Sequence, residues 1–297
     1  IVSEIESSEI VEDYTAEIET ETQTETQAEE TTEVIVETQA HTEAVVLDEV
    51  VDLGQMKVHF LDVGQGLSIL VQVEDKTLVY DGGDKSTSSY VVSYLKENDV
   101  KTIDYLVSSH YDSDHVYGLI GCLNAFEVKN VISSDYEHDS DTYDKFVSAV
   151  QKEGLRMQHP KVGAEFVLGS AKFVILSPEK ISKNDANENS VAIKLVHGEN
   201  TFVFTGDATI NSETEMIRSD IDLECDVLSL GHHGSATSTS WDFLQASVPE
   251  YAVLSCGKNN QYGHPDEDVM EKLESMEIDL FRTDKQGEIV AISNGVN

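Results

Sequence analysis

The stretch Ser109-His110-Tyr111-Asp112-Ser113-Asp114-His115 places two imidazoles and two carboxylates within six consecutive positions. It follows the largely apolar run 103–107, which is typical of a buried strand. Imidazole suits zinc and similar ions, whereas carboxylate suits harder ions such as manganese. Four such side chains exceed what one ion usually takes from a single loop, so the pattern predicts two ions that share a site. The alternative is a solvated loop whose histidines occur by chance.

Four further polar clusters stand where strand-like segments end. They are Asp81-Gly82-Gly83 after 77–80, Gly206-Asp207 after 201–204, Gly231-His232-His233-Gly234 after 227–230, and 259–265, with Asn260 and His264, after 252–254. Each cluster alone is weak evidence, because glycine-containing turns are common in unrelated loops. Together with the first stretch, they predict that distant parts of the chain converge on one metal-binding cleft.

The composition divides the chain into two parts. Residues 1–56 contain 17 Asp and Glu and no Lys or Arg. Such a segment repels itself and has too little apolar surface to offset the entropy of ordering, so we predict a disordered Thr/Glu-rich spacer. The remaining residues, 57–297, are long enough for one domain with a sizeable core.

The predicted domain is strongly acidic. Removing the 17 charges of the spacer from the formal net charge of −38 leaves −21 for residues 57–297. That balance argues against a general nucleic-acid binder, because phosphate contacts require Lys and Arg. The candidates to meet a phosphate are few: Lys180, Lys183, Lys194 and Lys258.

Helical and strand-like patterns alternate along the domain and predict an α/β sandwich of two sheets with helices outside them. The helical patterns cover 89–98, 115–124, 142–153, 211–217, 240–246 and 266–275. The strand-like patterns cover 58–62, 68–73, 77–80, 103–107, 128–132, 173–176, 191–196, 201–204, 227–230, 252–254, 278–282 and 288–292.

The order of these motifs resembles the metallo-β-lactamase superfamily. The motifs are HFLDVGQG, DGG, SSHxDxDHxxGL, ENSVAIKL, FTGDA, GHHGS and NxxYGHP. Within that superfamily, the chain is most similar to the hydrolase-like domain of ComEC-type competence proteins and to stand-alone secreted relatives. The resemblance covers residues 57 to about 294. It implies a four-layer αββα fold with two divalent metal ions, zinc or manganese.

The resemblance also implies roles for individual residues. His110 and Asp112 would hold one ion, Asp114 and His115 the other, and Asp207 would bridge both. His232 would complete the second site, although its neighbour His233 is an alternative that the sequence leaves open. Asp81 would orient a ligand imidazole.

The resemblance assigns further roles outside the metal ligands. Asn189 stands where many members have a metal-binding His, and Asn260 would support the site or the substrate. His264 would contact the substrate phosphate or donate a proton to the leaving group, so catalysis would rest on Asp114, Asp207 and His264.

The expected activity is metal-dependent hydrolysis of a phosphodiester. Two close divalent ions can lower the pKa of a shared water and hold the attacking and leaving oxygens. No Ser or Cys stands in a recognisable nucleophile setting, so metal-bound hydroxide is the expected attacker. A nuclease acting on single-stranded DNA is the specific version. The alternatives are a small-phosphoester or phosphorylcholine-type esterase and a non-catalytic, metal-containing surface binding module.

The composition of the N-terminal segment indicates where in the cell the protein acts. A Thr/Glu-rich leader before a globular domain fits a surface stalk, so we expect a bacterial protein that is secreted or held at the cell surface. A ragged intracellular terminus is the alternative. We predict no membrane-spanning helix, because the sequence lacks an apolar run of about 18 residues.

Overall fold

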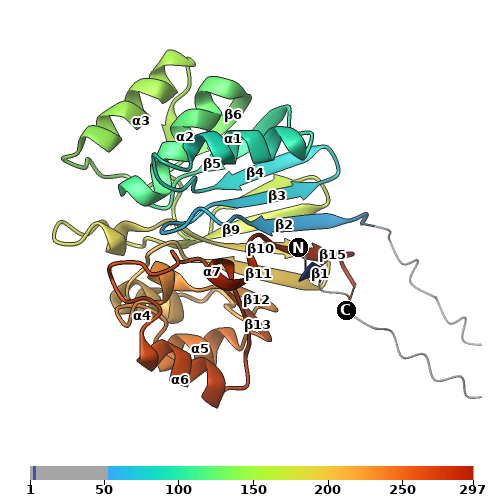
Figure 1. The fold of residues 1–297 in the computed structure, drawn as a ribbon, viewed down its shortest axis with the longest axis vertical. Coiled ribbons are helices and arrows are strands. Elements are labelled where there is room, and N and C mark those ends of the chain that lie inside the picture. The colour runs from blue at the N-terminus through green and yellow to red at the C-terminus, as the bar shows by residue number, and fades with distance from the viewer. Residues whose placement is uncertain (1–2, 5–52, 297) are drawn as a thin grey trace, which may run out of the picture. The chain divides into compact units, whose positions relative to one another are not determined.

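A computed structural model describes residues 3–4 and 53–296, which form two mixed sheets packed face to face with helices on both outer faces (Figure 1). This is the four-layer αββα sandwich expected from the sequence. Almost all of the predicted 1–56 spacer lies outside the described residues. The exceptions are residues 3–4 and 53–56, of which Met56 begins a strand.

The first sheet has eight strands in the order β1-β15-β2-β3-β4-β5-β6-β7. Strands β4 to β7 are parallel to one another, and β1 is parallel to β15. The pairs β15–β2, β2–β3 and β3–β4 are antiparallel. Their bounds are β1 Ser3–Glu4, β2 Met56–Phe60, β3 Ile69–Val73, β4 Lys76–Tyr80, β5 Thr102–Val107, β6 Glu127–Ile132, β7 Met157–Gln158 and β15 Ile289–Ser293.

The second sheet has seven strands in the order β14-β13-β12-β11-β10-β9-β8. Strands β11 to β14 are parallel, and β8 to β11 form an antiparallel meander. Their bounds are β8 Glu165–Leu168, β9 Ala171–Ser177, β10 Ala192–His197, β11 Asn200–Phe204, β12 Val227–Ser229, β13 Tyr251–Leu254 and β14 Asp279–Arg282.

Helices connect the parallel strands of each sheet and cover its outer face (Figure 1). On the first sheet these are α1 Ser88–Glu97, α2 Ser113–Ala125 and α3 Asp141–Lys152. On the second they are α4 Ile210–Arg218, α5 Trp241–Ser247 and α6 Glu267–Ser275, and the short elements are α7 Thr283–Gln286, η1 Asn187–Asn189 and η2 Gly231–Gly234. Among the residues that the structure describes, no helix combines the length and hydropathy needed to cross a bilayer.

The alternation of side chains along the strands builds the core between the sheets. In β2, Met56, Val58 and Phe60 all face the inter-sheet core, because successive residues of a strand point to opposite faces. Phe60 packs edge-on against Phe204 of β11, with ring centroids 6.1 Å apart. The two sheets are thereby held together directly beneath the turn that follows β11.

Candidate metal centre

The predicted ligands lie at the carboxyl ends of parallel strands in both sheets. Strand β4 ends one residue before Asp81, and β5 ends three residues before His110. Strand β11 ends three residues before Asp207, and β12 leads into η2, which contains His232 and His233. Parallel strands end at a common edge, so side chains from four connections converge there.

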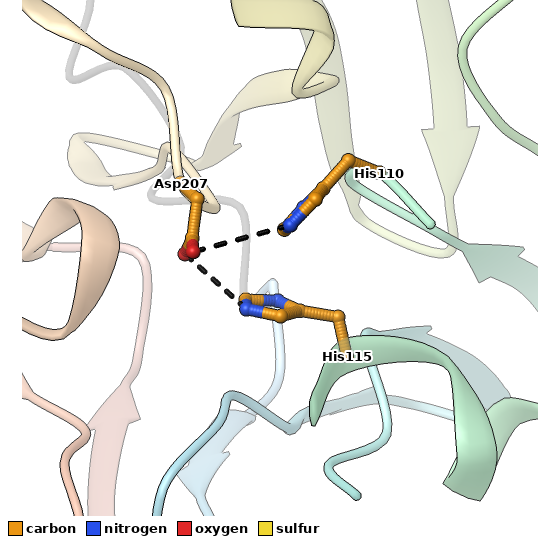
Figure 2. Close-up of side chains that lie close together, drawn as sticks. All are labelled: His110, His115 and Asp207. Carbon is orange, nitrogen blue, oxygen red and sulfur yellow. Dashed lines mark ion pairs between the residues drawn. The ribbon is translucent and has the colours of Figure 1, made fainter. Parts of the chain in front are cut away.

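Four imidazole side chains lie close to the carboxylate of Asp207. Figure 2 shows the side chains of His110, His115 and Asp207 pointing toward one another. Oδ1 of Asp207 lies 3.3 Å from Nε2 of His115, and Oδ2 lies 3.9 Å from Nε2 of His110. All three side chains are buried. Their ligand atoms lie within 4.8 Å of one another, a spacing suited to one shared cation.

A second group of possible ligands consists of Asp114, His115 and His233. Nε2 of His233 lies 3.2 Å from Nε2 of His115, 3.5 Å from Oδ2 of Asp114 and 3.7 Å from Oδ1 of Asp207. The resemblance to the family implies His232 in this group, with His233 as the alternative. In the structure, His233 is the imidazole beside Asp114 and His115.

His232 instead faces the other oxygen of Asp207. Its Nε2 lies 3.6 Å from Oδ2 of Asp207 and 3.4 Å from Nδ2 of Asn187, while its Nδ1 lies 2.8 Å from Oγ1 of Thr237. Asp207 thus presents Oδ1 to His115 and His233 and Oδ2 to His110 and His232. This division would suit a carboxylate that holds two cations.

The turn that carries the two histidines is strained. His232 has φ 48° and His233 has φ 55°, so two consecutive non-glycine residues adopt the left-handed conformation. Each such residue costs roughly 1–2 kcal/mol. Strain of this kind persists where surrounding structure fixes it and is common at functional sites. The turn directs both rings at Asp207, although the residues are adjacent in sequence.

Asp112 lies at the exposed side of the centre. Its Oδ2 is 3.6 Å from Nε2 of His110, and its side chain is 41% exposed. Asp112 occupies the N-cap position of α2, yet its carboxylate makes no capping hydrogen bond. The carboxylate is therefore available to a cation. His138 lies next to it, with Nε2 3.8 Å from Oδ1 of Asp112 and Nδ1 held by Ser140.

Asp81 supports the centre from beneath without facing the cleft. Its Oδ1 accepts a hydrogen bond from the backbone N–H of Ser109 at 2.7 Å. Its Oδ2 lies 2.7 Å from Nδ1 of His115 and accepts a hydrogen bond from Oγ of Ser109 at 2.6 Å. Nδ1 of His115 must carry a proton to bond this carboxylate, and Nε2 is then left to face Asp207.

Glycines allow Asp81 to approach α2 this closely. A Cβ added to Gly82 would lie 2.4 Å from the backbone N of Leu119 and 2.7 Å from the backbone C of Gly118. The N–H of Gly82 donates to the carbonyl of His115 at 2.6 Å. The turn after β4 is therefore joined directly to the first turn of α2, which carries Asp114 and His115.

The centre concentrates opposite charges. Burial disfavours a charge on His115, but the nearby Asp207 and Asp81 outweigh this effect and hold the pKa of His115 well above its usual value. Burial likewise opposes charge on Asp207, but His115 and His233 dominate and hold the pKa of Asp207 well below its usual value. The carboxylates thus require positive charge nearby, which protons or a bound cation can supply.

The residues present fit divalent cations. Nε2 of His110 and Oδ1 of Asp207 are buried and have no hydrogen-bond partner among residues 53–296. Buried polar atoms are rarely left unpaired without a reason. The donors are imidazole nitrogens and carboxylate oxygens, which suit zinc or manganese. The two ligand groups, joined by Asp207, match a centre that holds divalent ions.

Other residues that the resemblance had singled out lie around the centre. The amide of Asn189 is buried and bonded to the preceding loop, with Oδ1 accepting from the N–H of Ser182 at 2.7 Å and Nδ2 donating to the carbonyl of Ser182 at 3.0 Å. The amide of Asn260 bonds the backbone of its own loop, including both N–H and carbonyl of His264. Both asparagines therefore shape loops in this structure.

His264 lies beside the centre. Its ring packs edge-on against that of His232, with centroids 5.8 Å apart, and stacks on Tyr262 at 5.6 Å. Burial, the largest cause, lowers the pKa of His264. Two residues of the site were not predicted: Asn187, which contacts His232, and Ser109, which contacts Asp81. Ser109 directly precedes His110 in the motif, and this adjacency is the signal that could have identified it.

Comparisons with known proteins identify the family. The metallo-beta-lactamase superfamily profile matches residues 61–258. ComE operon protein 3 of Bacillus subtilis is 29% identical over 251 residues, and competence protein ComA of Neisseria gonorrhoeae is 33% identical over 243 residues. These alignments cover 78% and 80% of this chain but 32% of each relative. The chain therefore spans about a third of the length of these relatives.

A solved structure agrees with the fold. The metallo-beta-lactamase fold protein YhfI from Bacillus subtilis superposes with a TM-score of 0.53 at 14% identity, covering 80% of this chain and 99% of YhfI. The profile match, the sandwich and the placement of ligand groups at its edge agree. The two relatives named above are competence proteins of the ComEC type, and the chain belongs to the metallo-beta-lactamase superfamily.

Proposed function

We propose that this protein is a phosphodiesterase that cleaves nucleic acid, in particular single-stranded DNA, at a centre of two divalent ions. The family and the ligand groups support a metal-dependent hydrolase. The main support for a two-ion centre is that the two carboxylate oxygens of Asp207 face different pairs of imidazoles. Two ions held there would activate a water and offset charge on the phosphate.

The protein's own residues would orient these groups. Asp207 would span the pair, because its two oxygens face different imidazoles. His264 has a lowered pKa, chiefly through burial, and is therefore largely neutral near pH 7. A neutral ring carries one N–H, so we assign His264 a hydrogen bond to the substrate phosphate in preference to proton donation.

A cavity on the segment that contacts His232 contains both cationic and acidic side chains. Its volume is about 430 Å³, and its lining includes Lys180 and Arg218 together with Glu188 and Glu215. Ser182, which also lines the cavity, donates its backbone N–H to Asn189. Asn189 lies in the short helix η1, and Asn187 of the same helix contacts His232. A substrate that reaches from the centre over this segment would meet Lys180 and Arg218, and the two glutamates would disfavour a long polyanion there.

One lysine considered from the sequence is not available. Lys194 is buried, and its Nζ donates to Oδ2 of Asp222 at 2.8 Å and to the carbonyl of the same residue at 3.1 Å. The expectation that Lys194 meets a phosphate was wrong, because its ammonium group is engaged in an ion pair with Asp222. Lys180, Lys183 and Lys258 remain exposed.

The name of one relative supports nucleic acid as the substrate. ComA of Neisseria gonorrhoeae is named a competence protein, and competence is the uptake of DNA by bacteria. We extend this association to the present chain as part of the proposal.

The acidity of the domain favours a second candidate, a small phosphoester or phosphorylcholine-type ester. A net charge of −21 for residues 57–297 repels a long polyanion, whereas it affects a small or zwitterionic ester far less. A panel of bis-p-nitrophenyl phosphate, p-nitrophenyl phosphorylcholine and labelled single-stranded DNA separates the two candidates. Cleavage of the phosphorylcholine ester with intact DNA would favour the second.

The decisive variant is Asp207→Asn, assayed with manganese and with zinc. We expect it to lose metal-stimulated cleavage, because an amide cannot bridge two cations as a carboxylate does. Asp220→Asn, at an exposed position, is the matched control for the loss of one negative charge. Undiminished cleavage by Asp207→Asn would reject the proposed centre.

We also propose that the protein acts outside the cytoplasm, secreted or held at the surface of a bacterium. The long acidic segment before the domain supports this location. Fractionation of expressing cells with an antibody against the domain tests it, and recovery of the protein in the cytosol alone would contradict it.

A further inference from the structure

Two adjacent serines, Ser108 and Ser109, bond different parts of His110. Both are fully buried. Oγ of Ser108 donates to the backbone carbonyl of His110 at 2.5 Å. Oγ of Ser109 lies 2.9 Å from the ring nitrogen Nδ1 of His110 and also 2.6 Å from Oδ2 of Asp81. Only Ser109 therefore touches the imidazole.

The direction of these hydrogen bonds follows from the protons available. An ionised carboxylate can only accept, so the single hydroxyl proton of Ser109 points to Asp81. The oxygen of Ser109 is then an acceptor for His110, and Nδ1 of His110 must carry the proton. In a neutral ring, this leaves the lone pair on Nε2, the buried atom that faces Asp207 without a hydrogen-bond partner.

Asp81 thereby fixes two imidazoles of the centre, His110 and His115. It bonds Nδ1 of His115 directly, at 2.7 Å, and reaches Nδ1 of His110 through the hydroxyl of Ser109. Both rings are consequently set with Nε2 toward the centre.

Ser109 is also packed against the turn that carries Asp207. A Cβ added to Gly206 would lie 2.5 Å from Cβ and 2.8 Å from Oγ of Ser109. The carbonyl of Ser109 accepts a hydrogen bond from the N–H of Val191 at 2.8 Å. A residue larger than serine would not fit, whereas alanine would keep the Cβ and remove only the hydroxyl.

We propose that Ser109 is a positioning residue that holds His110 in the tautomer required for metal binding and couples it to His115 through Asp81. The proposal rests on the two-ion centre proposed above and concerns how that centre is preorganised. Partners of this kind typically change metal affinity by 10–100-fold when they are removed.

The test compares Ser109→Ala with Ser108→Ala, a neighbouring serine that is equally buried but bonds only the backbone of His110. Zinc titration followed by calorimetry and native mass spectrometry measures the affinity and number of ions. We expect Ser109→Ala to bind one zinc about 10–100-fold more weakly while the other is retained. Ser108→Ala should bind both as the unchanged protein does.

A second readout does not depend on activity or on bound metal. Long-range ¹H–¹⁵N spectra of the histidine rings report which nitrogen of His110 carries the proton. We expect Nδ1 to be protonated in the unchanged protein and in Ser108→Ala, with a shift toward the other tautomer in Ser109→Ala. The His115 signals should keep Nδ1 protonated in all three proteins.

The outcomes separate this proposal from the proposed function. Unchanged zinc affinity and unchanged His110 signals in Ser109→Ala would overturn the role of Ser109. An unchanged protein that binds fewer than two ions would instead overturn the two-ion centre, while the tautomer of His110 in the metal-free protein would still decide whether Ser109 positions this ring.

Discussion

Nδ1 of His115 lies 2.7 Å from Oδ2 of Asp81, and both side chains are fully buried. This contact joins the turn after β4 to the first turn of α2. It also turns the opposite nitrogen of His115 toward Asp207, 3.3 Å away. The position of one candidate ligand, His115, is therefore set by a carboxylate that does not face the cleft.

Asp81→Asn should weaken metal binding without removing a ligand. An amide has one acceptor oxygen, whereas Asp81 accepts from the N–H and hydroxyl of Ser109 and from His115. We expect a loss of about 10–100-fold in metal affinity. Competition with a metal-binding dye measures this loss, and the exposed Asp75→Asn is the control. Equal affinities of the two variants would contradict the role of Asp81.

His233→Asn should cost more bound metal than His232→Asn. His233 is 4% exposed and lies near Asp114, His115 and Asp207, whereas His232 is 25% exposed and faces Asp207 at 3.6 Å. Asparagine suits both positions, because it tolerates the left-handed backbone. Metal content after dialysis is the measurement. Greater loss in His232→Asn would show that the first histidine is the stronger ligand.

The metal-free protein should lose stability as the pH rises above 6.5. Asp207 and other carboxylates, acting against burial, raise the folded-state pKa of His115 and His233 above the usual 6.5 of an unfolded chain. Above pH 6.5 the folded state therefore binds more protons than the unfolded state, and its stability falls until the raised pKa values are passed. The lowered pKa of Asp207 has no effect there, since its contribution is lost only in acid.

Thermal unfolding of chelator-treated protein from pH 6 to 9 tests this dependence. Bound zinc should abolish or reverse the decline, because cations then replace the protons. A metal-free protein whose melting temperature rises over the same range would contradict the charge arrangement deduced for the centre.

Gly82→Ala should destabilise the domain. Its Cβ would lie 2.4 Å from the backbone of Leu119, and the helix backbone cannot yield as a flexible side chain would. We expect a loss of roughly 1–3 kcal/mol or more in the free energy of unfolding. Gly154→Ala, where φ is +71° and no atom lies within 4 Å, isolates the cost of a left-handed backbone. Urea unfolding of both variants gives the comparison, and Gly82→Ala should be the less stable.

Several elements could be predicted from local pattern. The helix expected at 142–153 is Asp141–Lys152 in the structure, and the helix expected at 266–275 is Glu267–Ser275. Strand β8, Glu165–Leu168, was missed. It is four residues long, and its neighbour β9 supplies the pairing that stabilises it, with Phe166 opposite Phe173. A short strand depends on its partner more than on its own sequence.

The order of residues is sufficient to predict a cluster of possible metal ligands at the sheet edges, because these residues follow apolar strands and parallel strands end together. The direction of each side chain depends on the folded arrangement. The left-handed turn after β12 brings His233, not His232, beside Asp114, and the amide of Asn189 is engaged by a neighbouring loop. The fold likewise places the hydroxyl of Ser109 between His110 and Asp81. Such directions depend on backbone angles and on contacts between distant segments, which residue order does not encode locally.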